Sequence, residues 1–151
     1  MSQGRVRPIV ICVFRRGEAI LVAQGYDRVK DETFYRPLGG GIELGESSRD
    51  GIVREMREEL GARIKDLRYL GTVENVFTCD GKPGHEIVMV YEAAFADESL
   101  YRAETLQGRE DDGSEIAVMW KPMADFRAGK EPLYPEGLLE LLGRTKADDP
   151  A

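Results

Sequence analysis

The segment from Ser48 to Leu60 constrains the fold most, because it is a helical pattern whose charges oppose helix stability. Within its sequence REMREEL, Glu55, Glu58 and Glu59 share one helical stripe, since they are spaced i, i+3 and i+4. Like charges at this spacing repel, and Gly61 as the C′ residue puts two of them at the negative end of the helix dipole. We therefore expect a positive partner from outside the helix.

Strand-like segments lie on both sides of this helix. Apolar or alternating runs predict strands at residues 6–14, 19–24, 67–78, 86–95 and 114–120. Short helices are predicted within 121–129 and 134–143, and the polar segments 25–34 and 96–113 are predicted to be mostly loop. This order predicts a mixed α/β or α+β fold. The length of 151 residues predicts one domain over residues 1–151.

Three consecutive glycines, Gly39 to Gly41, come shortly before the helix and directly after Pro37 and Leu38. A backbone without side chains is predicted to turn sharply here, or to approach another group closely. A phosphate-binding P-loop does not fit, because no Gly-Lys-Ser or Gly-Lys-Thr follows. Ser47 or Ser48 can then cap the start of the helix.

The composition argues against several classes of protein and of site. The formal net charge of −7 and a pI near 4.9 argue against a protein that binds duplex nucleic acid. Cys12 and Cys79 do not form a disulfide framework, so a reduced cytoplasmic setting is expected. His85 is the only histidine, which argues against a zinc site built on several His and Cys ligands. No apolar stretch approaches the ~20 residues that a membrane span needs.

The glycine-rich loop and the acidic helix together resemble the signature of the MutT/Nudix hydrolases. That signature reads Gly, five residues, Glu, seven residues, then Arg-Glu-aliphatic-X-Glu-Glu-X-Gly-aliphatic. Every fixed position is matched, by Gly40, Glu46, Arg54, Glu55, Glu58, Glu59 and Gly61. Met56 is an acceptable apolar residue, and Ala62 is smaller than usual. The resemblance, extended to residues 6–143, implies the Nudix α/β/α sandwich with a mixed central sheet.

The acidic stripe predicts a metal site. Carboxylates are hard oxygen ligands that suit Mg²⁺ or Mn²⁺, and such an ion would cancel the repulsion between Glu55, Glu58 and Glu59. The resemblance implies that the backbone carbonyl of Gly40 is a further metal ligand. Arg54 precedes Glu58 by one turn, so its guanidinium can hold a carboxylate in place.

The general base is left open. Glu58 and Glu59 are candidates within the helix, because the resemblance does not divide the roles of ligand and base between them. Downstream acids are the other candidates: Glu86, Asp111, Asp112 and Glu115. Glu115 joins Arg54, Glu58 and Glu59 in the predicted catalytic set, because it begins a strand directly after a polar loop. Most single acids of this kind are surface residues.

Substrate contacts are predicted from charge and aromatic character. Arg28, Lys30 and Arg36 precede the glycines and can meet phosphates, and Arg36 and Glu46 are the tentative substrate residues. Aromatic side chains that can stack on a nucleobase are Tyr26, Tyr35, Phe77 and Trp120, although strand aromatics more often belong to a core. Markers of the ADP-ribose, dinucleoside polyphosphate and NADH subfamilies are not evident, which weakens those assignments.

We therefore predict a Mg²⁺-dependent Nudix pyrophosphohydrolase that cleaves a phosphoanhydride in a nucleoside diphosphate derivative or a nucleoside triphosphate. The partner is a small nucleotide, with no duplex nucleic acid and no membrane. A homodimer is common among the proteins that the chain resembles. The alternative is a Nudix-fold ligand sensor without turnover, against which the intact set of Glu55, Glu58 and Glu59 argues.

Overall fold

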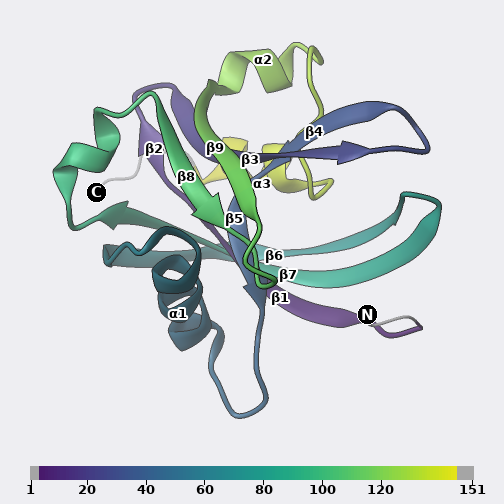
Figure 1. Ribbon diagram of the computed structural model, residues 1–151, viewed down its shortest axis with the longest axis horizontal. Coiled ribbons are helices and arrows are strands. Elements are labelled where there is room, and N and C mark those ends of the chain that lie inside the picture. Colours follow the sequence, from purple (N-terminus) through teal and green to yellow (C-terminus); the bar gives the residue numbers. More distant parts are fainter. Residues whose placement is uncertain (1–3, 146–151) are drawn as a thin grey trace.

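Two β-sheets form the centre of the molecule, and the computed structural model describes residues 4–145 (Figure 1). The first sheet has the order β5-β1-β7-β6. Its parallel β1–β7 pair is flanked by antiparallel pairs, so the sheet is mixed as predicted. Its strands are β5 (Leu38–Gly41), β1 (Arg7–Val13), β7 (Lys82–Phe95) and β6 (Ile64–Cys79).

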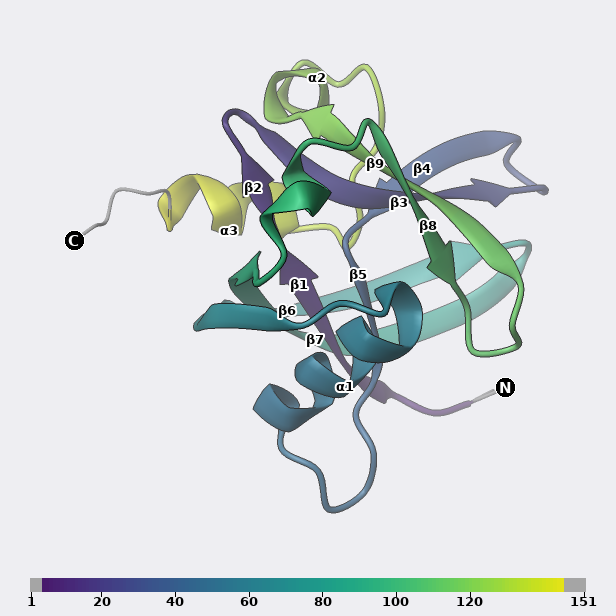
Figure 2. The same ribbon diagram turned by 60° about the vertical axis from the view of Figure 1, so that its left-hand side comes forward.

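The second sheet is antiparallel and has the order β2-β3-β9-β8, with β4 paired to β3. Its strands are β2 (Arg15–Arg16), β3 (Ala19–Asp27), β9 (Glu115–Pro122), β8 (Thr105–Arg109) and β4 (Glu32–Arg36). The remaining elements are α1 (Ser48–Leu60), the 3₁₀ helix η1 (Glu98–Tyr101), α2 (Met123–Arg127) and α3 (Leu138–Arg144). Figure 2 shows the two sheets and their helices from a second direction.

Strand β1 is buried on both faces, which explains its continuous apolar sequence. Val10 and Cys12 pack in one core cluster with Ile52 and Met56 of α1. Ile9, Ile11 and Val13 belong to a second cluster that contains Leu138, Leu141 and Leu142 of α3. Because side chains alternate along a strand, α1 and α3 cover opposite faces of β1. The predicted mixed α+β architecture is confirmed.

Helix α1 begins and ends as its sequence predicts. The Ser47 side chain accepts a hydrogen bond from the backbone amide of Asp50 (3.1 Å), which caps the N-terminus. Gly61 ends the helix with a φ of 65°, a left-handed conformation in which its N–H donates to the carbonyl of Arg57. Ile52 and Met56 are fully buried beneath the helix.

The predicted loop at 25–34 is wrong, because strand β3 extends to Asp27 and β4 begins at Glu32. The side chain of Asp27 accepts hydrogen bonds from the amides of Val29 and Lys30 (both 3.0 Å), so a polar turn closes this hairpin. The apolar alternation of a half-buried strand is weak here, since much of the hairpin is exposed.

Two further expectations need correction, and a third is decided between its two alternatives. Residues 96–113 contain η1 and β8 rather than mostly loop, because β8 pairs with β9 along its whole length. Of the two alternatives for the glycines at 39–41, the sharp turn is not found, because these residues form strand β5 on β1. Helix α3 begins at Leu138, later than the predicted 134.

Candidate active site

Strand β5 brings the glycines against helix α1. A Cβ atom on Gly40 would lie 2.5 Å from Oε2 of Glu55, and one on Gly39 would lie 2.0 Å from the carbonyl oxygen of Val10. Neither position has room for a side chain. The predicted close approach is therefore confirmed, and the group approached at Gly40 is the carboxylate of Glu55.

Arg54 is the positive partner that orders the acidic residues of this site. Its Nε and Nη2 donate to both oxygens of Glu46 (2.7 and 3.0 Å), a bidentate pair. Its Nη1 donates to Glu55 (3.0 Å) and Glu58 (3.1 Å), and its Nη2 also reaches the carbonyl of Gly41 (3.0 Å). The hydrogen bonds from Arg54 lower the pKa of Glu46 to about 2. Glu46, predicted as a tentative substrate residue, thus makes its contacts with the loop and Arg54.

One cation does not satisfy the buried carboxylates. Glu55 is 3% exposed and Glu59 is 8% exposed, and Oε1 of each has no hydrogen-bond partner among residues 4–145. Burial, followed by the nearby charges of Glu55, Glu110 and Asp111, raises the pKa of Glu59 to about 8. Burial also raises the pKa of Glu55, against the opposing effect of Arg54. Such groups are costly to bury ionised and unpaired, so each either takes up a proton or binds a cation.

An acid from a distant loop joins the helix. Ligand atoms of Glu55, Glu58 and Asp111 all lie within 4.8 Å of one another, a separation that one divalent ion could span. Asp111 lies between β8 and β9 and was predicted only as one of several base candidates. A single acid within a polar loop carries no local signal that would single it out. The donor set consists of carboxylate oxygens, which fits Mg²⁺ or Mn²⁺.

A cavity of about 210 Å³ opens beside this cluster. Gly39–Gly41 and the acids Glu59, Glu110 and Asp111 line it, and Arg7 and Arg36 supply positive charge. Phosphate groups could therefore meet both a metal-binding side and two guanidinium groups. Arg36, a tentative substrate residue, lies where such a contact is possible.

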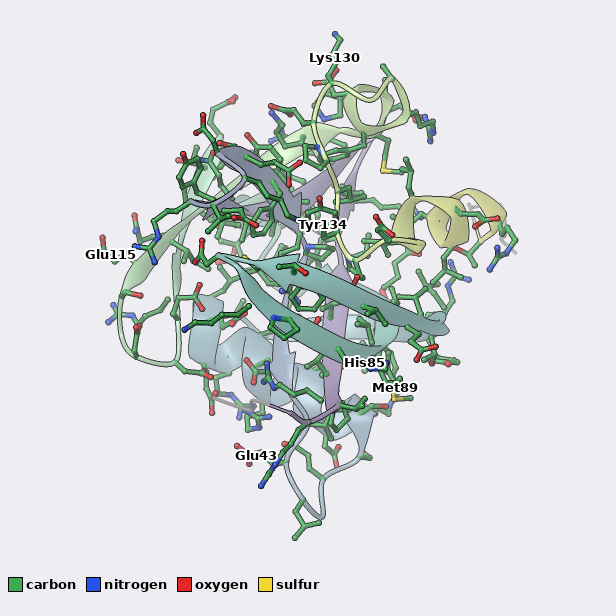
Figure 3. The ribbon with its side chains drawn as sticks, turned by 90° about the vertical axis from the view of Figure 1, so that its right-hand side faces the viewer. Glu43, His85, Met89, Glu115, Lys130 and Tyr134 are labelled. Carbon is green, nitrogen blue, oxygen red and sulfur yellow. The ribbon has the colours of Figure 1, made fainter. Side chains whose placement is uncertain are left out.

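Two other candidate acids and the single histidine lie outside this cavity. Glu115, the first residue of β9, is exposed and does not line the cavity, so the geometry favours Asp111 over Glu115 as the loop acid (Figure 3). Asp112 accepts hydrogen bonds from Ser114 of its own turn. His85 faces Glu74 at 2.7 Å on the exposed surface.

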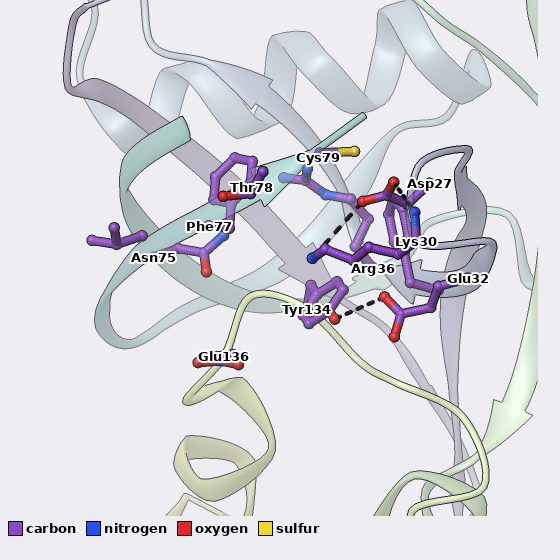
Figure 4. Close-up of a pocket in the computed structure, with 12 residues that line it drawn as sticks. Asp27, Lys30, Glu32, Arg36, Asn75, Phe77, Thr78, Cys79, Tyr134 and Glu136 are labelled. Carbon is purple, nitrogen blue, oxygen red and sulfur yellow. Dashed lines mark hydrogen bonds and ion pairs between the residues drawn. The ribbon is translucent and has the colours of Figure 1, made fainter. Parts of the chain in front are cut away.

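A second, larger cavity of about 420 Å³ adjoins the first at Arg36, which lines both (Figure 4). Its aromatic walls are Phe34, Phe77 and Tyr134. Each Phe ring lies over a glycine on the neighbouring strand, since a Cβ on Gly25 or Gly84 would come within 2.5 Å of the ring of Phe34 or Phe77, respectively. The rings are therefore held flat against the strands. Its polar wall includes Lys30, Asn75 and Glu136.

The other predicted substrate contacts are elsewhere. Tyr35 and Trp120 are buried in the two core clusters, as strand aromatics usually are. Tyr26 is half exposed and bonds to Asp31. Arg28 pairs with Asp80 of the next hairpin. Of the predicted aromatic contacts, only Phe77 lines the aromatic cavity, and Phe34 and Tyr134 were not predicted to lie there.

Comparison with known proteins agrees with the motif. The NAD-capped RNA hydrolase NudC of Pectobacterium carotovorum subsp. carotovorum (strain PC1) is 35% identical over 92 residues, covering 61% of this chain and 32% of that protein. The chain thus matches about a third of the length of this curated relative. The MutT NUDIX hydrolase of Burkholderia pseudomallei has a similar structure, with a TM-score of 0.65, 20% identity and coverage of 94% and 99% of the two chains.

The solution structure of the E. coli ORF135 protein is similar as well, with a TM-score of 0.56, 26% identity and coverage of 95% and 96% of the two chains. No helix among residues 4–145 is long and apolar enough to cross a membrane. A family model for the NUDIX domain matches residues 4–141. The predicted resemblance to Nudix hydrolases is thereby confirmed, and the chain belongs to the NUDIX family.

Proposed function

We propose that the chain is a divalent-metal-dependent pyrophosphohydrolase, which cleaves a phosphoanhydride bond in a nucleoside diphosphate derivative or a nucleoside triphosphate. The observation that carries this proposal is the convergence of Glu55, Glu58 and Asp111 beside a cavity that two arginines also line. Buried carboxylate oxygens without a partner support the presence of a cation when the enzyme works.

Glu55, Glu58 and Asp111 would hold the ion, Mg²⁺ or Mn²⁺, with the carbonyl of Gly40 as the further ligand that the family resemblance implies. A bound divalent ion supplies a Lewis acid that stabilises charge on phosphate oxygens and lowers the pKa of water. Arg54 fixes the rotamers of Glu55 and Glu58 through its hydrogen bonds.

Glu59 is our candidate for the general base. It lines the cavity and is not one of the three converging ligands, so its carboxylate is available to orient a water molecule or accept its proton. Without a metal ion, burial and the nearby acids raise its pKa to about 8, and a divalent ion bound beside it would lower that pKa, so that the carboxylate is free to accept a proton. Glu115, which does not line the cavity, remains a weaker candidate.

Arg7 and Arg36, which line the same cavity, would bind phosphate oxygens. The aromatic cavity beyond Arg36 would hold the nucleobase against Phe34, Phe77 or Tyr134. The relative NudC is named for NAD-capped RNA, and by analogy a dinucleotide-type pyrophosphate belongs on the list of substrates to test. We propose a cytoplasmic setting, which the free thiols of Cys12 and Cys79 support.

The test is a substrate panel assayed with and without Mg²⁺. It contains oxidised and ordinary nucleoside triphosphates, nucleoside diphosphates, ADP-ribose, nucleotide sugars, NAD and dinucleoside polyphosphates. We expect metal-dependent cleavage of at least one compound. If the folded protein binds nucleotides but cleaves none of these compounds, a ligand sensor replaces the enzyme as the favoured function.

A further inference from the structure

The two cavities share one lining residue, Arg36, and a carboxylate beside it has no role in the proposed reaction. Arg36 lines both the cavity beside α1 and the aromatic cavity. A nucleotide that places its phosphates in the first and its base in the second must therefore pass Arg36 with its sugar. The following inference rests on that placement, and so on the proposed function.

Glu86 lies directly beside Arg36 and is an unusual residue. It is 5% exposed, on strand β7, and its Oε1 has no hydrogen-bond partner among residues 4–145. The nearest cationic nitrogens are Nη2 of Arg36, 3.9 Å from Oε1, and Nη1 of Arg7, 3.9 Å from Oε2. Both distances are too long for hydrogen bonds. A buried carboxylate that has charges nearby but no donors is costly, and a ligand that brings donors would relieve that cost.

Asn75 extends this polar site toward the aromatic cavity. It is 6% exposed, it lines that cavity, and it is paired with Glu86 across β6 and β7. Side chains of directly paired residues point to the same face of a sheet. Glu86 and Asn75 therefore form a polar row between the phosphate-binding and aromatic regions.

The chemistry of a nucleotide shows which part of it can supply the missing donors. Ionised phosphates offer only acceptors, and the base is expected in the aromatic cavity. The sugar lies between them, and the hydroxyls of a ribose are donors that a carboxylate accepts well. We propose that Glu86 is a substrate-binding residue whose carboxylate accepts hydrogen bonds from the vicinal 2′- and 3′-hydroxyls of a ribose. The preferred substrates are then ribonucleotides rather than 2′-deoxyribonucleotides.

Recognition of the ribose by Glu86 predicts how strongly the enzyme prefers ribonucleotides. A 2′-deoxy substrate leaves part of the buried carboxylate unsatisfied, and hydrogen bonds to charged groups are the strong ones. The wild-type enzyme should therefore prefer each ribonucleotide to its deoxy counterpart by about 10- to 100-fold in kcat/KM. Glu86→Gln keeps the shape but removes the charge and one acceptor, so it should lower kcat/KM more for the ribonucleotide than for the deoxy substrate, which offers only its 3′-hydroxyl.

The experiment measures kcat/KM for four matched pairs of ribo- and deoxyribonucleoside triphosphates with the wild type, Glu86→Gln and Glu92→Gln. Glu92 is a matched control because it lies on the same strand, is also flanked by two arginines, Arg15 (3.2 Å) and Arg68 (3.0 Å), and lines neither cavity. Glu92→Gln should keep the wild-type preference. Equal activity of the wild type on both sugars overturns the proposal. An equal loss on both sugars in Glu86→Gln also overturns it, because Glu86 then only positions Arg7 and Arg36.

Binding separates this proposal from the proposed reaction. The melting temperature is measured with the ribo- and 2′-deoxyribonucleoside diphosphates of all four bases. If nothing is hydrolysed but the ribonucleoside diphosphates stabilise the wild type more than Glu86→Gln, the catalytic proposal fails and ribose recognition stands. If no diphosphate binds, or both sugars stabilise equally, ribose recognition is wrong even where turnover is found.

Discussion

The acidic site at helix α1 and the aromatic cavity beyond Arg36 are built in opposite ways. Five carboxylate and arginine groups of the first site come from one short segment, and Arg54 links Glu46, Glu55 and Glu58 through hydrogen bonds of 2.7–3.1 Å. The aromatic cavity gathers Phe34, Phe77 and Tyr134 from three separate parts of the chain, and Tyr134 donates a hydrogen bond to Glu32 across it. Local spacing fixes the first region, whereas the tertiary fold fixes the second.

This difference suggests that the acidic region carries out the reaction and the aromatic region selects the substrate. The acidic region has a fixed arrangement of charges that fits a metal ion and phosphate groups. Phosphate groups are common to many substrates. The aromatic region and Glu86 form surfaces whose shape and donors can select one substrate. Changes in the first region should therefore lower kcat, and changes in the second should raise KM.

The largest effect is expected in the acidic region. Glu59→Gln removes a carboxylate that we assign as the general base, so kcat should fall at least about 100-fold while the fold is retained. Asp50→Asn is the control, because Asp50 is an exposed acid in the first turn of the same helix. Initial rates at saturating Mg²⁺ and circular dichroism spectra of both variants provide the check. A Glu59→Gln enzyme with a nearly normal rate would move the base elsewhere.

A change in the aromatic region should act on binding instead. Phe77→Ala removes a ring from the cavity wall, and base stacking contributes roughly 1–3 kcal/mol per base. KM should rise about 10-fold or more while kcat changes little. Tyr69→Ala is the control, since this half-exposed tyrosine on the same strand lines neither cavity. A fall in kcat without a change in KM would contradict the division between the two regions.

A substitution at Gly40 tests whether the acidic region depends on the close packing of β5 against α1. Gly40→Ala places a Cβ atom 2.5 Å from the Glu55 carboxylate, so that carboxylate must move. We expect a loss of about 1–3 kcal/mol in unfolding free energy and at least a tenfold loss of turnover. Gly143→Ala has no atom within 4 Å and lies in α3, so it should leave turnover unchanged. Chemical denaturation and rate measurements on both variants compare the outcomes.

The smallest effect concerns stability without substrate. Mg²⁺ relieves the repulsion among buried carboxylates, so millimolar Mg²⁺ should raise the melting temperature by a few degrees. The increase should grow with rising pH, because burial raises the pKa of Glu55 and a bound proton competes with the ion. Scanning calorimetry with and without chelator, at several pH values, measures both. An unchanged melting temperature at high pH would argue against a preformed site.

The sequence predicted most of the first region because its groups are close together along the chain. The spacing from Gly40 to Gly61 placed Glu55, Glu58 and Arg54 on one helix, and caps at Ser47 and Gly61 marked its ends. The contact between Gly40 and Glu55 was foreseen only as a close approach, since its partner depended on β5 pairing with β1.

Little of the aromatic region could be predicted from the sequence. The hairpin of β3 and β4 has too weak an apolar alternation to predict, so Phe34 was assigned to a loop. Asp111 and Tyr134 join their sites only after β8, β9 and the segment before α3 are packed in place. Glu86 was one of several acids with no local distinction, and its burial beside Arg36 follows from pairing between β1, β6 and β7.

The most direct test of a metal site at α1 is a Mn²⁺ titration of the metal-free protein, followed by electron paramagnetic resonance. It compares the wild type with Glu58→Gln, within the helix, and Asp111→Asn, from the distant loop. A metal site at α1 predicts that both substitutions weaken Mn²⁺ binding by about tenfold or more, because each removes one of three converging carboxylates. Unchanged affinity in both variants would contradict it, and the acidic stripe of α1 would then be a solvated helix face.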